Sequence, residues 1–226
     1  MNWWRALFAM VQKDIRIEAR AKTLYISALV FGALLVLLFG FAAGGAVRMP
    51  AGFTSGSLWL IVFVSALLSF NRQDDKERWD DALSGALAAP VDRSAVFYAR
   101  LIANALFVAA VEAAILPLFF MVFGLAPPAH AGAFAAAVAL GTWAFVALGT
   151  FLTAVGAASS LREILVPVML LPLSIPLFLA LVTLTDDALA RFAPVQSPAG
   201  WWVVLAAYAL LFTALPGLLF EYLVEV

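Results

Sequence analysis

Six long stretches of almost uninterrupted apolar residues divide the chain, and the polar residues gather between them. The stretches cover residues 24–47, 53–70, 101–123, 133–158, 164–185 and 201–220. A helix needs about 20 mostly apolar residues to cross the hydrocarbon core of a bilayer. None of the stretches alternates like a barrel strand, and a helix satisfies its own backbone groups within lipid. The pattern therefore predicts an all-α polytopic membrane protein, a single domain over residues 1–226 with six transmembrane helices.

Basic residues flank these stretches unevenly. If the N-terminus is cytoplasmic, eleven of the 13 Lys and Arg residues lie on the cytoplasmic side, and only Arg48 and Arg191 lie on the other. The eleven are Arg5, Lys13, Arg16, Arg20, Lys22, Arg72, Lys76, Arg78, Arg93, Arg100 and Arg162. Loops rich in Lys and Arg stay in the cytoplasm. We therefore expect both termini to be cytoplasmic, because six spans return the chain to the side where it started.

Residues 2–22, before the first stretch, have the pattern of an amphipathic helix. Its apolar positions are Trp4, Leu7, Phe8, Val11 and Ile15, and its polar positions are Arg5, Gln12, Lys13, Arg16 and Arg20. Such a helix lies in the membrane interface. We expect an elbow helix here, and two interpretations stay open: an anchor whose cations meet anionic lipid headgroups, or a mechanical part.

The one substantial polar segment, residues 71–93, separates the second and third stretches. Within it Trp79, Leu83 and Leu87 recur at four-residue intervals, which predicts one apolar stripe on a short helix that Pro90 would end. The helix either rests on the bilayer as a solvated loop element or forms the docking surface for a soluble partner. The outer connections are short; the longest, residues 186–200, could hold a helical turn or dip back toward the membrane.

Two polar residues, Asn104 and Glu112, interrupt the third stretch. A charged side chain at mid-membrane costs about 2.5–3.5 kcal/mol on insertion scales, so Glu112 is expected to face a partner or water. Eight residues place Asn104 about 80° round the helix from Glu112, close enough to share a face. Glu112 is then either a substrate or proton site, or a protonated, hydrogen-bonded residue that holds helices together. The structural role of Glu112, in holding helices together, is the favoured interpretation, because the stretches contain no second mid-depth charge.

Three prolines, Pro167, Pro172 and Pro176, predict a kinked or broken fifth helix. Gly40 and Gly44 allow a close helix approach near the outer end of the first span. His130, the only histidine, lies in an outer loop, where a lone histidine is seldom a haem or metal ligand.

Composition excludes most chemistry. The chain is 65% hydrophobic with a mean hydropathy of +1.05, against about 45–50% apolar for soluble domains. Its net charge of −1 gives no electrostatic case for nucleic acid, and without cysteine it has no disulfide or thiolate metal site. It lacks a phosphate-binding G-x-x-x-x-G-K-[ST] motif, and no nucleophile–base or metal-ligand cluster is visible. We expect no catalytic residue, no metal site and no bound ATP, so any active function must draw on a partner.

The polar segment resembles the cytoplasmic loop of ABC-2-type permeases, in which a charged run, a leucine-bearing helix and a Pro-x-x-Arg element precede the third span. Within that class the chain resembles the CcmB family of haem exporter permeases of cytochrome c maturation. The resemblance rests on residues 13–18 (KDIRIE), residues 87–93 (LAAPVDR), Asn104 with Glu112, Leu116-Pro117, and residues 162–167 (REILVP).

The resemblance implies an ABC-2 permease fold in the bacterial inner membrane and a coupling helix that docks on an ATPase. The implied ATPase-coupling residues are Trp79, Asp80, Asp81, Leu83, Leu87, Pro90, Asp92 and Arg93. The implied partners are an ATPase resembling CcmA, which alone binds ATP, membrane proteins resembling CcmC and CcmD, and a second copy of this chain. Haem would be the substrate, or ATP hydrolysis would release a haem-loaded chaperone. The Trp-Trp-Asp haem signature of CcmC is absent, because Val203 follows Trp201-Trp202.

Three hypotheses remain. The first is this ATP-driven permease, for haem or another hydrophobic substrate. The second is a proton-coupled carrier centred on Glu112. The third is a scaffold that transmits motion to haem-handling partners without transporting anything.

Overall fold

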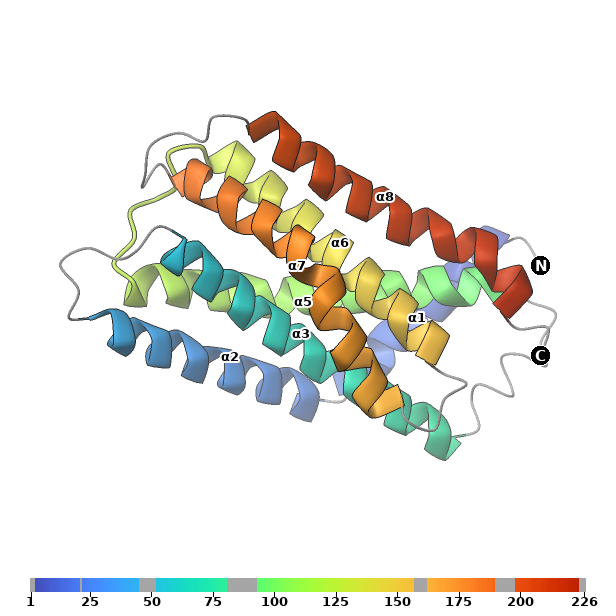
Figure 1. Ribbon diagram of the computed structural model, residues 1–226. Coiled ribbons are helices and arrows are strands. Elements are labelled where there is room, and N and C mark those ends of the chain that lie inside the picture. Colours follow the sequence, from blue (N-terminus) through green and yellow to red (C-terminus); the bar gives the residue numbers. More distant parts are fainter. Residues whose placement is uncertain are drawn as a thin grey trace.

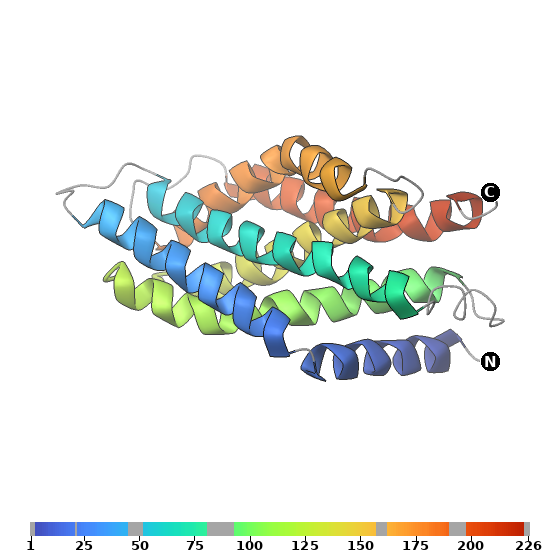
Figure 2. The same ribbon diagram turned by 90° about the horizontal axis from the view of Figure 1, so that it is seen from below.

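A computed structural model describes residues 3–20, 22–44, 52–80, 93–156, 162–189 and 198–223, and within these ranges the chain forms helices joined by turns and one short irregular segment at residues 125–128. The helices are α1 (Trp3–Arg20), α2 (Lys22–Ala43), α3 (Phe53–Asp80), α5 (Arg93–Val122), α6 (Ala131–Gly156), α7 (Arg162–Leu189) and α8 (Pro198–Leu223). Helices α2 to α8 run up and down as one bundle, and α1 crosses it near one end (Figures 1 and 2). We call the end where α2, α5 and α7 begin the proximal end, and the other the distal end.

Among the described residues, five helices are long and apolar enough to cross a membrane. The qualifying segments are Tyr25–Ala43, Ser94–Val122, Ala131–Gly156, Pro167–Leu189 and Pro198–Pro216. The stretch predicted at residues 53–70 lies in α3, whose apolar part over Phe53–Leu67 is shorter. The prediction of a multi-pass helical membrane protein is therefore confirmed, while a sixth span stays a prediction.

Helix α3 does not end with its apolar part but continues to Asp80, and its whole length is 28 residues. The sequence explains this, because neither Gly nor Pro occurs between Gly56 and Gly85, and the intervening polar stretch is rich in the helix formers Gln, Glu, Lys and Arg. The first part of the predicted coupling helix is therefore a continuation of α3 and not a separate element.

Helix α6 forms the centre of the bundle and packs against α5, α7 and α8. Its residues from Ala144 to Thr150 are all buried, which is more than one full turn, so neighbours surround the helix there. Small residues permit this close packing. A Cβ added at Gly141 would clash with Leu181 of α7 and lie 2.7 Å from the ring of Trp59 on α3.

Helix α2 packs lengthwise on α5. A Cβ at Gly32 would clash with Ile115, and one at Gly40 would clash with Val122. The predicted close approach is thus confirmed at Gly40, whereas Gly44 is exposed and Gly32 makes an approach that was not predicted from the sequence. Because both contacts come in the same order along the two helices, α2 and α5 run parallel.

Helix α7 continues through Pro167, Pro172 and Pro176, and it bends in its middle (Figure 1). The hydroxyl of Tyr208 on α8 donates a hydrogen bond of 3.0 Å to the carbonyl of Leu173, between two of these prolines. The predicted kink is therefore present, but the helix is not broken. Asp186, assigned to a loop from the sequence, lies in the last turns of α7; residues 190–197 of that loop lie outside the described ranges.

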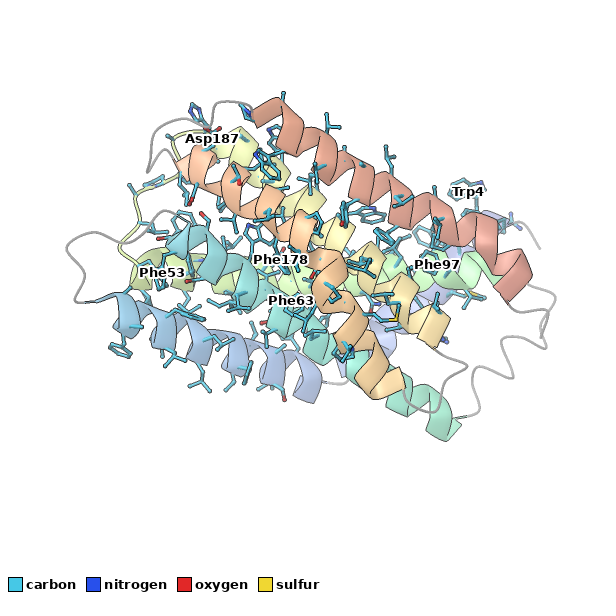
Figure 3. The ribbon with its side chains drawn as sticks, viewed as in Figure 1. Trp4, Phe53, Phe63, Phe97, Phe178 and Asp187 are labelled. Carbon is cyan, nitrogen blue, oxygen red and sulfur yellow. The ribbon has the colours of Figure 1, made fainter. Side chains whose placement is uncertain are left out.

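The predicted N-terminal helix is present as α1, and it packs on α5. Leu7 is buried there, and the indole N–H of Trp3 donates to Ser94 Oγ at 3.2 Å. Trp4 and Phe8 remain 74% and 77% exposed, and Trp4 lies at the edge of the bundle (Figure 3). The apolar face of α1 is therefore divided: one part holds α5, and the other faces outward.

Candidate functional site: polar contacts between the helices

The residues predicted to couple to an ATPase lie at the proximal end or beyond the described ranges. Trp79 and Asp80 are the last two residues of α3, and Arg93 is the first of α5. Asp81, Leu83, Leu87, Pro90 and Asp92 fall within residues 81–92, which are outside the described part of the chain. Their grouping as a docking surface stays a prediction.

Asn104 and Glu112, the polar pair predicted within the third stretch, both bind α6. Asn104 Nδ2 donates to Thr150 Oγ1 at 3.2 Å, and Thr142 Oγ1 donates to Glu112 Oε1 at 2.6 Å. The partners are eight residues apart on each helix, so two antiparallel helices carry polar rungs at the same two-turn spacing. The expectation that Asn104 and Glu112 share a face is therefore confirmed. We call these four residues the α5–α6 ladder.

The ladder is buried. Glu112, Asn104, Thr142 and Thr150 are each no more than 4% exposed. A carboxyl group in such surroundings requires a partner, and the hydroxyl of Thr142 supplies one. Asn104 Oδ1 is buried without a hydrogen-bond partner among the described residues. This arrangement supports the structural interpretation of Glu112, in which the carboxyl joins two helices.

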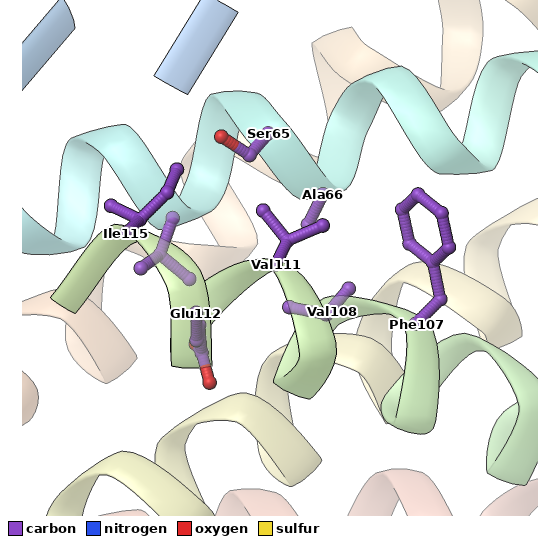
Figure 4. A pocket seen from close by; sticks show the side chains of 8 residues that line it. Ser65, Ala66, Phe107, Val108, Val111, Glu112 and Ile115 are labelled. Atoms are coloured by element: carbon purple, nitrogen blue, oxygen red, sulfur yellow. The ribbon is translucent and has the colours of Figure 1, made fainter. Parts of the chain in front are cut away.

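A small pocket lies beside Glu112, between α3 and α5. Its cavity volume is about 10 Å³, roughly the room that one water molecule needs, whereas ligand sites usually offer roughly 300–1,000 Å³. The lining residues are Val62, Ser65, Ala66, Phe107, Val108, Val111, Glu112 and Ile115. Figure 4 shows the carboxyl of Glu112 pointing away from the α3 residues Ser65 and Ala66. The pocket is a packing crevice in this conformation, and it is too small for haem.

A second polar cluster, which was not predicted from the sequence, joins α3 to α7 at the distal end. The hydroxyl of Ser55 donates to Asp186 Oδ1, and the indole N–H of Trp59 donates to Thr185 Oγ1 at 2.9 Å. Ser55 and Thr185 are completely buried, and Trp59 is 2% exposed. A sequence signal was available in the four-residue spacing of Ser55 and Trp59, but nothing in the sequence identified α7 as their partner. We call Ser55, Trp59, Thr185 and Asp186 the distal latch.

A third group of contacts converges on Thr213 of α8. The hydroxyl of Tyr98 on α5 donates to the Thr213 carbonyl at 3.1 Å, and the indole N–H of Trp143 on α6 donates to Thr213 Oγ1 at 3.0 Å. Tyr98 also meets the ring of Trp3 edge to face. Four helices are therefore linked near the proximal end, next to the start of α5.

The side chains that could hold a metal ion do not gather in the described ranges, where no group of three or more His, Asp or Glu residues meets. His130 is exposed in the turn before α6, and its backbone N–H donates to the carbonyl of Ala188 at 3.0 Å. Its place in the structure is set by this backbone contact with the end of α7.

Comparison with known proteins bears on the whole chain. A protein-family model described as "CcmB protein" matches residues 5–221, a range that includes nearly all of the described helices. The chain is also similar to the heme exporter protein B of Rhodobacter capsulatus. The two are 29% identical over 195 residues, which cover 85% of this chain and 89% of that protein.

Proposed function

The chain belongs to the CcmB protein family, and from this membership we propose that it is the permease subunit of an ATP-driven exporter serving cytochrome c biogenesis. The observation that carries the proposal is the match over residues 5–221, which leaves no room for a separate catalytic domain within the matched range. The similar protein of Rhodobacter capsulatus is named a heme exporter, so haem is the proposed cargo. ATP hydrolysis belongs to a partner chain resembling CcmA.

The proposed arrangement in the membrane has six spans, namely the five helices that are long enough to cross and, in addition, α3. It follows the ABC-2 permease fold. Both termini are cytoplasmic in the bacterial inner membrane, which is consistent with α1 and the end of α8 lying at the proximal end (Figure 1). In this arrangement α1 is the elbow, with the exposed Trp4 and Phe8 in the interface. Two copies of the chain and two ATPase subunits form the core, together with proteins resembling CcmC and CcmD.

The proposed contact with the ATPase is the segment from residue 71 to residue 93. Helix α3 extends from the bundle into this segment and ends at Asp80. This supports the assignment, because a docked ATPase would then act on a helix of the bundle itself. Charged side chains surround the apolar stripe of Trp79, Leu83 and Leu87 in the sequence. A charged rim around an apolar strip suits a protein partner.

Co-purification with the ATPase tests this assignment. Leu83→Ala combined with Leu87→Ala should reduce the amount of bound ATPase at least about tenfold, because a few residues carry most of the binding energy of an interface and two of the three residues of the stripe are truncated. Leu38→Ala is the matched control: Leu38 is 61% exposed on α2, far along the sequence from the segment. Full ATPase binding and normal ATP turnover by the double variant would refute the coupling role.

A subunit that transports haem and a scaffold that only transmits motion require different movements of the bundle. Haem passage requires the helices to separate beyond the small pocket beside Glu112, whereas the helices of a scaffold need only to tilt. Bulky substitution at Ala66, which lines that pocket, should block haem delivery if haem passes between α3 and α5. Unchanged haem delivery by a stable Ala66→Leu protein would favour the scaffold over passage of haem between α3 and α5.

A further inference from the structure

Helix α3 connects the two ends of the bundle without a proline, whereas α5, α7 and α8 each contain at least one. Its 28 residues span about 42 Å, and no Gly or Pro interrupts it after Gly56. Sharp bends in helices arise at proline, at glycine or where the hydrogen-bond ladder is interrupted. A displacement applied at Asp80 is therefore delivered to the distal end instead of being absorbed on the way.

The distal end of α3 is fastened to a helix of the opposite character. The distal latch joins Ser55 and Trp59 to Asp186 and Thr185 of α7, the helix that three prolines bend. Proline removes a backbone hydrogen bond, so α7 can change its curvature at lower cost than α3 can. The latch thus ties a rigid rod to a compliant one.

We infer that α3 is the lever of the transport cycle and that the distal latch is the contact that opens when the lever moves. The inference rests on the proposed function, because the force comes from an ATPase docked at residues 71–93. Ser55, Trp59, Thr185 and Asp186 are then positioning residues, which hold the distal end closed between cycles. Opening would bring their buried polar groups to water from the distal surface, which offsets the loss of the two hydrogen bonds.

Thiol accessibility tests the inference directly, since the chain has no cysteine. Ser55 is completely buried, and a thiol in its place keeps a weak hydrogen-bond donor for Asp186, so a Ser55→Cys thiol should react slowly with a water-soluble maleimide in the resting complex. ATP added to the complex of this chain with its ATPase should raise the labelling rate at least about tenfold. Ser57→Cys is the matched control: Ser57 lies at the same depth on α3 and is 5% exposed, but its hydroxyl binds Phe53 of its own helix.

A second pair of variants loosens the latch without ATP. Trp59→Phe removes the N–H that binds Thr185, and Trp143→Phe removes an equivalent N–H that binds Thr213 on α8. In the Ser55→Cys background, the loss of one hydrogen bond should raise resting labelling about fivefold for Trp59→Phe. Trp143→Phe should leave it within about twofold.

The outcomes separate the latch from the proposed function. If the ATPase does not bind or is not active, the proposed function fails and the lever fails with it. If the ATPase is bound and active but ATP leaves Ser55→Cys labelling unchanged, or raises Ser57→Cys labelling equally, the lever alone is overturned. Equal resting labelling in the Trp59→Phe and Trp143→Phe backgrounds would overturn the latch.

Discussion

Removing the hydroxyl of Thr142 should destabilise the bundle by leaving Glu112 without its partner. Thr142→Val keeps the shape of the side chain but removes the donor of the 2.6 Å hydrogen bond to Glu112 Oε1. Hydrogen bonds between membrane helices contribute about 0.6 kcal/mol on average and up to about 1.7. An unsatisfied buried acceptor costs about 1–3 kcal/mol. Because Glu112 is only 4% exposed, we expect a loss of about 1.5–2.5 kcal/mol in the free energy of unfolding.

The measurement is reversible unfolding in mixed micelles with increasing dodecyl sulfate. Thr183→Val is the matched control, because the hydroxyl of Thr183 binds the carbonyl of Leu179 in its own helix and joins no second helix. Adding Glu112→Leu to Thr142→Val should recover part of the loss, since both members of the pair are then apolar. Glu112→Gln keeps a carbonyl acceptor for Thr142 and should cost less than about 1 kcal/mol.

Two results would refute this account of Glu112. One is a Thr142→Val protein no less stable than Thr183→Val, which would mean that the hydrogen bond contributes nothing to packing. The other is a Glu112→Gln protein that folds normally, binds the proposed partner ATPase and yet fails in cytochrome c maturation. That result would move Glu112 from helix packing to the transport step itself, as the proton-carrier hypothesis requires.

Other contacts predict further outcomes. Gly141→Val should cost about 1–3 kcal/mol or more in unfolding free energy, because its side chain would meet Leu181 where α6 is enclosed. Trp3→Phe should cost about 0.5–1.5 kcal/mol through the lost bond to Ser94, and Ser94→Ala combined with it should add little, as a thermal-shift cycle would show. Leu7→Asp should free α1 from α5 and expose it to limited proteolysis in membranes, with an undisturbed α1 counting against its docking on α5.

Much of the fold could be predicted because length and hydropathy decide it. Five of the predicted stretches became helices long enough to span, since an apolar run of about 20 residues has few other stable forms in lipid. The second apolar stretch ends at residue 70, whereas α3 continues to Asp80, because hydropathy marks where the membrane ends and not where the helix ends. Helix propensity, read separately, would have extended it.

Among the contacts of the site, too, some could be predicted from the sequence and others could not. The shared face of Asn104 and Glu112 follows from helical spacing on one helix, and the structure confirms it through Thr150 and Thr142. The identity of α6 as the partner does not follow, because threonines occur in several stretches and a threonine on its own carries no signal. Periodicity describes one helix at a time, whereas a hydrogen bond between helices depends on how two of them cross.

The distal latch is a contact that depends on how two helices cross, and it bears on function. Asp186 lies next to an apolar stretch, and from the sequence it was assigned to a loop that connects two spans. In the structure α7 continues to Leu189, so Asp186 becomes a partner of the buried Ser55 at the start of α3. An acidic side chain near the first turn of α3 also favours the helix dipole there. Because Asp186 lies on a helix and not in a loop, it fixes where the stiff helix α3 meets the proline-bent α7. Its contact with Ser55 is therefore one that α3 must break when it moves.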